Sequence, residues 1–433
     1  MARSDGSAVR GVSPRSEGSS PHLPPRDHRR TLLGIVPASR TPSSRAASPG
    51  PSTAALAVVG GRLCSDLVEV TSDLAALDSS GFWAVVLPFE GEPVCARFAT
   101  VRPARPWPGP PWIGPSPDAW TSSLDRDQFM ASVTTIRERI AAGDVYQVNL
   151  TRRLSAPLPR PTAGRSFESR STGGRSTGGR STDIAALGAA LAVGNPAPYS
   201  AVVRLPSHGI AVASASPERF VRRDGDVVRS SPIKGTAATA DGFLVKDRAE
   251  NVMIVDLVRN DIGRVCEWGS VTVPELLAVE PHPGLHHLVS TVEGRLRPGV
   301  GWADLVDATF PPGSVTGAPK LAALESIAEL EPVPRGLYCG AIGWVDADRR
   351  CGDLNVAIRT FWIEDDALHF GTGGGITYGS DPAGEWAETE LKAQRLLEVA
   401  SSPGDPVPVG RAAGGQAAGG RRTTTDSWED GHG

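Results

Sequence analysis

One lysine is a candidate for covalent or proton-transfer chemistry. Of the 433 residues only four are lysine, at positions 234, 246, 320 and 392, and arginine supplies every other basic side chain among the 44. Lys234 lies in the run Pro232-Ile233-Lys234-Gly235-Thr236. Arginine stays charged at any working pH, but burial can deprotonate an ammonium, which then acts as a nucleophile or base. The alternative is an ordinary salt bridge.

Two segments carry pairs of acids at helical spacing. Asp247 and Glu250 are three residues apart, as are Glu385 and Glu388, and Lys392 follows four residues later. Residues three or four apart share one face of a helix. If the two helices face each other, their carboxylates form an oxygen-rich cage that suits Mg²⁺ better than a soft metal. The alternative is two solvated faces with local salt bridges.

A carboxyl group and a glycine run offer further chemistry. Glu218 follows Pro217 at the end of an expected strand, and can serve as a general acid if burial raises its pKa. The alternative is an ion pair with Arg219 or Arg222. Residues 371–375, Gly-Thr-Gly-Gly-Gly, predict a loop whose unhindered amides bind a carboxylate or phosphate, or else a plain glycine turn. The run lacks the Gly-Lys-Ser/Thr ending of a P-loop, so a nucleotide site is weakly supported.

The elements that position these groups mix helices and strands. Phe129, Val133, Ile136 and Ile140 mark one face of a helix that Gly143 can terminate. Further helices are expected over 246–260, from 316–319 onward, and over 384–399, and strands over 145–154, 201–205, 209–222, 226–233, 338–345, 351–363 and 367–371. Hairpins and separated helices favour an α+β domain over a regular βαβ array.

Composition narrows the class of protein. The net charge of −4 gives no reason to expect a nucleic-acid partner, and no apolar run approaches the roughly 20 residues of a membrane span. The five cysteines are odd in number and lack CxxC spacing, which is typical of reduced thiols in a cytoplasmic protein. Cys339 has no obvious base nearby, so we expect a buried structural cysteine rather than a nucleophile.

Low-complexity segments divide the chain. Residues 1–54 form a basic arm rich in Ser, Pro and Arg that we expect to be disordered, and we expect the same of the polar tail 402–433. Between them, 55–401 is expected to be one catalytic domain with a short N-terminal portion, 55–120. Within it, 160–182 contains a tandem Ser-Thr-Gly-Gly-Arg repeat without apolar residues, which indicates a flexible insertion.

Taken in order, these segments resemble the chorismate-utilising enzymes, which include anthranilate synthase component I, aminodeoxychorismate synthase component I, and the isochorismate and salicylate synthases. The resemblance covers about 125–400. It depends on the motifs at 143–152, 216–220, 232–236, 247–261, 287–290, 313–320, 358–360, 371–375 and 385–389. It implies an α+β fold in which antiparallel sheets form a β-sandwich core with outer helices.

The resemblance also implies roles for individual residues. Glu250 and Glu388 would bind Mg²⁺ directly, Asp247 and Glu385 would hold metal-bound waters, and the metal would clamp the ring carboxylate of chorismate. The substrate-binding set implied by the family is Gly235, Thr236, His287, Ser314, Tyr338, Arg359, Gly373, Gly375 and Lys392. Of these, Tyr338 and Arg359 would bind the enolpyruvyl carboxylate, and the two glycine amides would bind a substrate carboxylate. Glu218 would protonate the hydroxyl that leaves ring carbon four.

Two positions separate the branches of this family. Members that add water carry a lysine base where this chain has Gln147, so the resemblance implies an enzyme that uses ammonia. Anthranilate synthases have alanine where this chain has Lys234, whereas aminodeoxychorismate synthases have lysine, which attacks ring carbon two. The nearest alternative is therefore anthranilate synthase component I, and others are a silent chorismate-binding subunit and, more weakly, a nucleotide-binding protein.

The chain lacks two features found elsewhere in the family. Residues 55–100 carry no clear tryptophan-binding motif, which makes feedback by tryptophan doubtful. No Gly-x-Cys-x-Gly-x-Gln elbow of an amidotransferase occurs in the sequence. We therefore expect ammonia to come from a separate glutamine amidotransferase subunit, or from solution at high concentration.

Overall fold

The computed structural model describes residues 54–159, 181–237, 239–282 and 285–401. The predicted disordered arm and tail fall outside this part of the chain, apart from Ala54. The predicted insertion also falls outside it, apart from Ser181 and Thr182. The described residues belong to one unit, Pro49–Gly433.

Antiparallel pairing joins the described strands into one continuous sheet. The strands are β1 (Leu56–Val59), β2 (Arg62–Thr71), β3 (Phe82–Leu87), β4 (Val94–Pro103), β5 (Thr121–Ser122), β6 (Gln147–Pro157), β7 (Tyr199–Leu205), β8 (Ile210–Ser216), β9 (Arg219–Asp224), β10 (Val227–Ser231), β11 (Ile233–Ala237), β12 (Thr272–His282), β13 (Leu285–Arg295), β14 (Gly317–Ala318), β15 (Ala341–Asp346), β16 (Cys351–Val356), β17 (Thr360–Glu364) and β18 (Ala367–Ile376). The helices are α1 (Arg126–Ala142), α2 (Ile184–Gly194), α3 (Val245–Gly263), α4 (Trp302–Thr309), α5 (Lys320–Leu330) and α6 (Pro382–Ser401). Helices beside an antiparallel sheet confirm the predicted α+β class.

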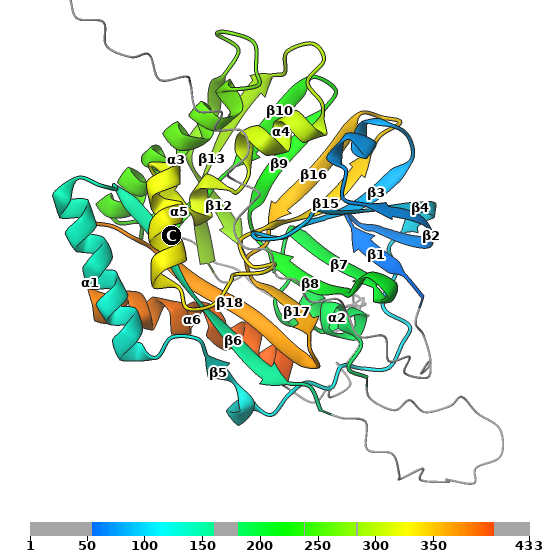
Figure 1. The fold of residues 1–433 in the computed structure, drawn as a ribbon, viewed down its shortest axis with the longest axis horizontal. Helices are drawn as coiled ribbons and strands as arrows, with labels where there is room; N and C mark the ends of the chain where they lie inside the picture. Colours follow the sequence, from blue (N-terminus) through cyan, green and yellow to red (C-terminus); the bar gives the residue numbers. More distant parts are fainter. Residues whose placement is uncertain (1–53, 160–180, 238, 283–284, 402–433) are drawn as a thin grey trace, which may run out of the picture. The chain divides into compact units, whose positions relative to one another are not determined.

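The first strands of the domain join the middle of the sheet. Figure 1 shows β1–β4 beside β15 and β16, and β3 pairs with β15 from Phe82↔Asp346 to Leu87↔Ala341. The largest apolar core lies here, with Trp83 and Trp302 almost completely buried. The short N-terminal portion is therefore part of the same core as the segments that carry the family motifs.

A long strand pair forms the other region of the sheet. β6 pairs with β18 over ten positions, from Pro157↔Ala367 to Val148↔Ile376. Helices α1 and α5 pack on this pair through a core that includes Phe129 and Leu150, while α6 contacts β18 and α1 (Figure 1). Apolar side chains on one face of β6 thus bind the helices, and the opposite face is available for polar groups.

The predicted end of the helix at Gly143 is confirmed, because its capping residue is local. Asp125 and Gln128 form a capping box at the start of α1, and Gly143 ends the helix with φ of 86°. The predicted helices 246–260 and 384–399 correspond to α3 and α6. The helix expected from 316–319 begins later, at Lys320, because Gly317–Ala318 forms the short strand β14 and Pro319 is the N-cap.

Several strand predictions were wrong in detail. The run 209–222 is two strands, interrupted at Pro217-Glu218, and 226–233 is also two strands, interrupted at Pro232. The strand expected over 338–345 begins at Ala341, and 351–363 is interrupted at 357–359, where Arg359 has φ of 52°. The glycine run 371–375 is neither a loop nor a turn but the end of β18. Glycine disfavours strands intrinsically, so here the ten-residue pairing with β6 outweighs the local preference.

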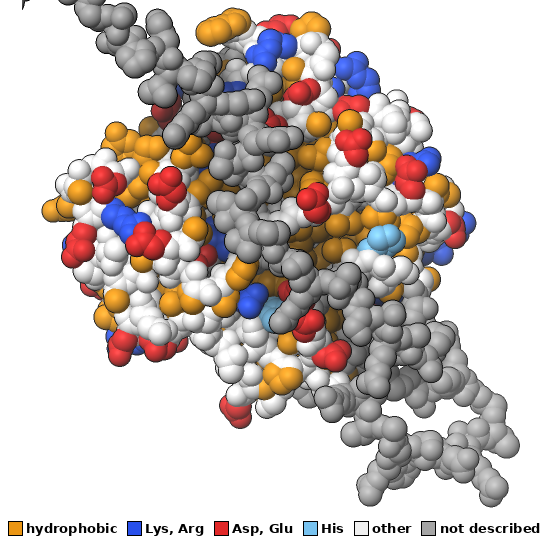
Figure 2. Space-filling view, in the orientation of Figure 1, with side chains coloured by type: hydrophobic (Ala, Val, Ile, Leu, Met, Phe, Trp, Pro, Cys, Tyr) orange, Lys and Arg blue, Asp and Glu red, His pale blue; other side chains and the backbone are white. Residues whose placement is uncertain are grey.

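On the face of the molecule shown in Figure 2, acidic and basic side chains are interspersed with apolar ones. None of the described helices is both long and apolar enough to cross a membrane.

Candidate active site

Lys234, Gln147 and Ser314 come together above the end of β18. The Lys234 amine donates to the Ser314 carbonyl oxygen at 3.2 Å. A Cβ placed on Gly375 would lie 2.1 Å from Gln147 Nε2 and 3.3 Å from Lys234 Nζ. Any other residue at 375 would therefore displace the Gln147 amide, which explains why glycine is required there.

The surroundings of Lys234 make its amine easier to deprotonate. Burial lowers the pKa of Lys234, and the ammonium of Lys392 lowers it further. The carboxylates of Glu250, Glu218 and Glu388 raise it, which shows that acids from three separate elements face this amine. The net direction is downward, as nucleophilic or basic chemistry requires.

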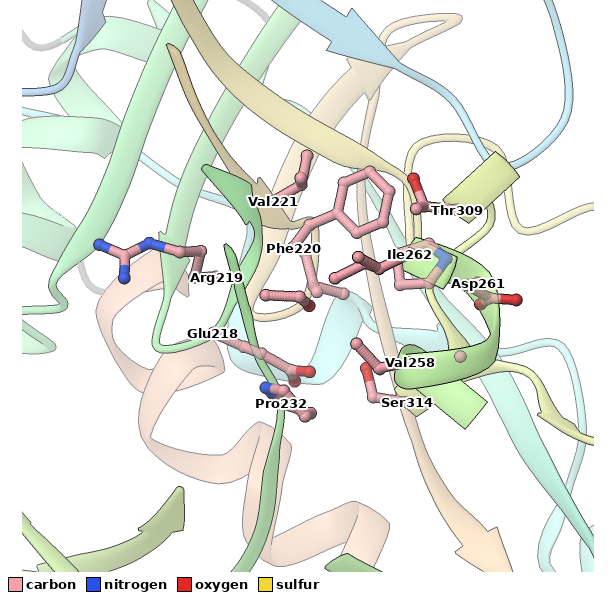
Figure 3. Close-up of a pocket in the computed structure, with 14 residues that line it drawn as sticks. Glu218, Arg219, Phe220, Val221, Pro232, Val258, Asp261, Ile262, Thr309 and Ser314 are labelled. Carbon is pink, nitrogen blue, oxygen red and sulfur yellow. The ribbon is translucent and has the colours of Figure 1, made fainter. Parts of the chain in front are cut away.

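Glu218 faces the same point from the gap between β8 and β9. Burial raises its pKa to about 7, although the Ser314 hydroxyl, the Lys234 ammonium and the Ile233 amide lower it. Figure 3 shows the Glu218 carboxyl group and Ser314 at one end of a small cavity, beside Pro232 and Val258. A carboxyl group with this pKa keeps its proton near neutral pH, so it can serve as a general acid.

Gln147 brings an unsatisfied acceptor to this cluster. The residue is 1% exposed, and its Oε1 has no hydrogen-bond partner among the described residues. A buried amide oxygen without a donor is costly, so its retention indicates a site that a ligand completes.

The four predicted acids divide into two pairs. Glu250 on α3 and Glu388 on α6 both act on the Lys234 amine, and Glu388 pairs with Lys392 at 2.7 Å. Asp247 caps α3 by accepting from the Leu244 amide at 2.8 Å. Glu385 accepts from the Ser380 hydroxyl at 2.6 Å. Within the described ranges, no three Asp, Glu, His or Cys side chains gather closely enough to hold a metal.

The glycines of β18 form the floor of the site. The Asn149 and Thr151 amides donate to Thr316 and to Glu331, not to β18. Their register partners Gly375 and Gly373 therefore direct their backbone groups away from β6, and Lys392 donates to the Gly373 carbonyl at 3.0 Å. The two amides lie at an edge of β18 that pairs with no other described strand beyond Phe370.

Tyr338 lies at the other end of this floor, and Arg359 lies in the gap between β16 and β17. A Cβ on Gly371 would lie 2.1 Å from the Tyr338 ring, so the buried ring packs directly on the strand. Arg359 is half-buried, and burial lowers its pKa. Its guanidinium makes no hydrogen bond or ion pair with any residue in the described part of the chain, as expected of a cation that binds an anionic ligand.

The remaining predicted residues line the strands beside Lys234. Gly235 has φ of 88°, and a Cβ there would lie 2.9 Å from Asp247 Cβ, so glycine lets β11 approach the start of α3. His287 is 2% exposed on β13, opposite Thr236 in register. The side chain of Thr236 is outside the described part. Cys339 is buried and its pKa is raised to about 12 by burial, which agrees with a structural thiol.

The sequence analysis missed a buried ion pair that supports the site. Arg335 and Glu331 pair at 2.7 Å with side chains 1% and 5% exposed. Arg335 also donates to the Val315 and Asn149 carbonyls, and Glu331 accepts from the Thr151 amide. The pair therefore connects β6 to the segment that carries Ser314. The only local signal was the spacing of four residues.

Comparisons with known proteins agree with this arrangement. A family model described as chorismate binding enzyme matches residues 108–398. The aminodeoxychorismate synthase component 1 of Klebsiella aerogenes is 42% identical over 299 residues, covering 66% of this chain and 60% of that protein. The anthranilate synthase component 1 of Streptomyces coelicolor is 41% identical over 291 residues, covering 64% and 52%. The chain thus spans between about half and 60% of the length of these two relatives.

Solved structures show the same fold. Anthranilate synthase component I from Streptococcus pneumoniae superposes with a TM-score of 0.61 at 24% identity, covering 83% of this chain and 95% of that one. The menaquinone-specific isochorismate synthase of Escherichia coli gives 0.62 at 17% identity, covering 80% and 89%. The predicted fold is therefore confirmed. With the family model matching most of the described residues, the chain belongs to the chorismate-binding enzyme family.

Proposed function

We propose that this chain is an aminodeoxychorismate synthase component I, which converts chorismate and ammonia to 4-amino-4-deoxychorismate through a covalent bond to Lys234. The observation that supports it most is a lysine of lowered pKa beside a carboxyl group whose pKa is about 7. Sequence identity does not separate the two nearest activities, because relatives named for each are 42% and 41% identical. The residue at 234 therefore decides the proposal.

The two side chains divide the reaction between them. Glu218 gives its proton to the hydroxyl oxygen on ring carbon four, which departs as water while the neutral Lys234 amine bonds to ring carbon two. Ammonia then bonds to carbon four, the bond between carbon two and the lysine nitrogen breaks, and the amine leaves neutral. The surplus proton of the new ammonium returns to Glu218. One difficult displacement thus becomes two easier ones.

Other residues hold the substrate during these steps. Arg359, whose guanidinium has no ion pair with the described residues, would bind the enolpyruvyl carboxylate together with Tyr338. Gly373 and Gly375 present backbone amides along the floor, near Lys392. Lys234 lies at the Gly375 end of β18 and Tyr338 at the Gly371 end. Groups that contact the substrate from both ends of one strand support a single bound orientation of the ring.

We propose a magnesium ion at the acids of α3 and α6 on the chemistry of their oxygen donors, since among the described residues no three acids are gathered closely enough to hold a metal. Glu250 and Glu388 would bind it directly, with Asp247 and Glu385 holding its waters, since an all-oxygen donor set suits a hard cation. When bound, the metal would neutralise the ring carboxylate.

Ammonia is proposed to come from a separate glutamine amidotransferase subunit. The relatives from Klebsiella aerogenes and Escherichia coli are named component 1, which implies a second component for those proteins. We also place the protein in the cytoplasm, in keeping with five cysteines that are all free.

The decisive experiment is liquid chromatography of products formed from chorismate, Mg²⁺ and ammonium. A peak of 4-amino-4-deoxychorismate is expected. An anthranilate peak without it would assign the chain to anthranilate synthase instead, and absence of turnover would indicate a silent chorismate-binding subunit.

Replacing Glu388 tests the metal site. The E388Q variant should need about ten-fold more Mg²⁺ for half-maximal rate, because one charged ligand is lost. The matched control is E398Q on the exposed side of the same helix, which should follow the wild type. Equal magnesium dependence of both variants would remove Glu388 from the metal site.

A further inference from the structure

The turn between β3 and β4 is fastened to the segment that carries Tyr338. The Phe89 amide donates to the Gly336 carbonyl at 2.8 Å. The two carboxylate oxygens of Glu90 accept from the amides of Arg335 and Gly336 at 3.3 and 2.9 Å. The Arg335 guanidinium also lies 4.6 Å from the centre of the Phe89 ring. The turn thus contacts the beginning of this segment through a backbone hydrogen bond, a carboxylate that accepts from two amides, and an aromatic ring beside a guanidinium.

Leu87, the last residue of β3 before this turn, contacts the end of the segment. A Cβ on Gly340 would lie 2.1 Å from the Leu87 carbonyl oxygen, so only glycine allows the two chains to approach this closely. Residues 335–340 are therefore held at both ends by 87–90, which lie some 245 residues earlier in the chain.

The segment needs external support because its backbone is strained. Cys339 has φ of 66° and Arg359 has φ of 52°, a conformation that costs energy for residues other than glycine. Backbone bonds from the Cys339 amide to the Ala357 carbonyl and from the Ala357 amide to the Gly340 carbonyl connect this segment to Ala357, two residues before Arg359. A shift of 335–340 would therefore move Tyr338 and Arg359 together.

We propose that the β3–β4 turn positions the substrate-binding pair Tyr338 and Arg359, and that Glu90 is the positioning residue through which it acts. The inference rests on the proposed function, since it assigns chorismate to that pair. Glu90 does not touch the substrate. It fixes the backbone two residues before Tyr338, and through Cys339 and Ala357 it fixes the backbone of Arg359.

Calorimetric titration with chorismate and Mg²⁺, without ammonium, tests this directly. E90A should raise Kd roughly ten-fold, because a displacement of less than an ångström weakens a charged contact. E90Q keeps one carbonyl acceptor and should give an intermediate value. The matched control is E92A in the same turn, where the exposed carboxylate has no partner among the described residues, and its Kd should equal that of the wild type.

A double-mutant cycle separates positioning from general stabilisation. If Glu90 acts through Arg359, E90A should change Kd by less than about two-fold in an R359A background. The inference is overturned if E90A binds chorismate with the same Kd as E92A. It is also overturned if E90A still raises Kd roughly ten-fold in the R359A background. Failure of the wild type to bind chorismate would overturn the proposed function and this inference with it.

Discussion

Lys234 and Lys320 are two lysines in one domain whose pKa burial lowers, yet their surroundings differ. The Lys320 ammonium donates to Asp261 at 2.7 Å and to the carbonyls of Thr309 and Pro311 at 3.2 and 3.0 Å, which uses all three of its protons. Lys234 makes one hydrogen bond within the described residues, to Ser314. The carboxylates of Glu250, Glu218 and Glu388 act on its charge and raise its pKa.

The difference separates a structural cation from a reactive amine. Losing a proton from Lys320 would leave Asp261 without its counterion, so the charged form is required by its partners. The hydrogen bond from Lys234 to the Ser314 carbonyl uses one of its protons, so the amine can lose another and then has a free lone pair. Burial alone therefore does not predict whether a lysine is reactive. The number of its protons that are used in hydrogen bonds does.

The strongest test of this comparison is substitution of Lys234. K234A should lower formation of 4-amino-4-deoxychorismate by about 10³-fold or more, or divert turnover to anthranilate, since the nucleophile is lost. K234R should be equally inactive, because a guanidinium keeps its charge. Product chromatography measures both. A K234R variant of normal rate would show that position 234 supplies only charge.

Replacing Glu218 should slow the reaction in which Lys234 takes part. E218Q is expected to slow turnover by about 10² to 10³-fold because it cannot donate the proton. In the wild type the rate should fall as pH rises through about 7, where Glu218 loses its proton. The pH–rate profile of E218Q should lack the alkaline limb. Persistence of that limb would assign it to another group.

Replacing Lys320 should lower the free energy of unfolding and leave the reaction product unchanged. K320M is expected to lower the free energy of unfolding by about 3 kcal/mol, since it leaves Asp261 buried and unpaired. Denaturant unfolding measures the change, and the product should stay the same. The double variant D261N/K320M removes the unpaired charge and should recover part of the loss. No recovery would mean that Lys320 contributes mainly through the Thr309 and Pro311 carbonyls.

The smallest effect is expected from deleting part of the predicted insertion. The prediction of a flexible insertion over 160–182 needs one refinement, because Ser181 exchanges backbone hydrogen bonds with Pro111 and Ile113. Deleting 164–178 should leave unfolding and rate unchanged, whereas deletion through Ser181 should lower the melting temperature by a few degrees. A melting scan of the two deletions compares them, and a loss of rate in the shorter one would contradict a passive insertion.

The sequence predicted what depends on local pattern and on long motifs. The 3.6-residue period and Gly143 determine α1, and the acids at 250 and 388 were placed on the correct helices. The fold class followed from the order of elements. Lys234 and Glu218 act on each other's charge in the structure, and the catalytic roles implied for them stay predictions.

What could not be predicted depends on distant partners. Glycines 371–375 have no side-chain pattern, so their place in β18 follows only from the pairing with β6. Arg359 takes a left-handed backbone that no residue-type preference indicates. The partners of Lys320 lie in the segment before α5 and, for Asp261, 59 residues away, and no spacing rule connects a lysine with an acid at that distance.

The register between β6 and β18 limits how this floor can change during evolution. Successive residues of a strand point to opposite faces, so one inserted residue before Gly371 would put Thr372 and Gly374 where Gly373 and Gly375 now lie. Related enzymes can therefore acquire new specificities by exchanging side chains around the floor, at positions such as 147 and 234. Changes of length are confined to the connections outside it.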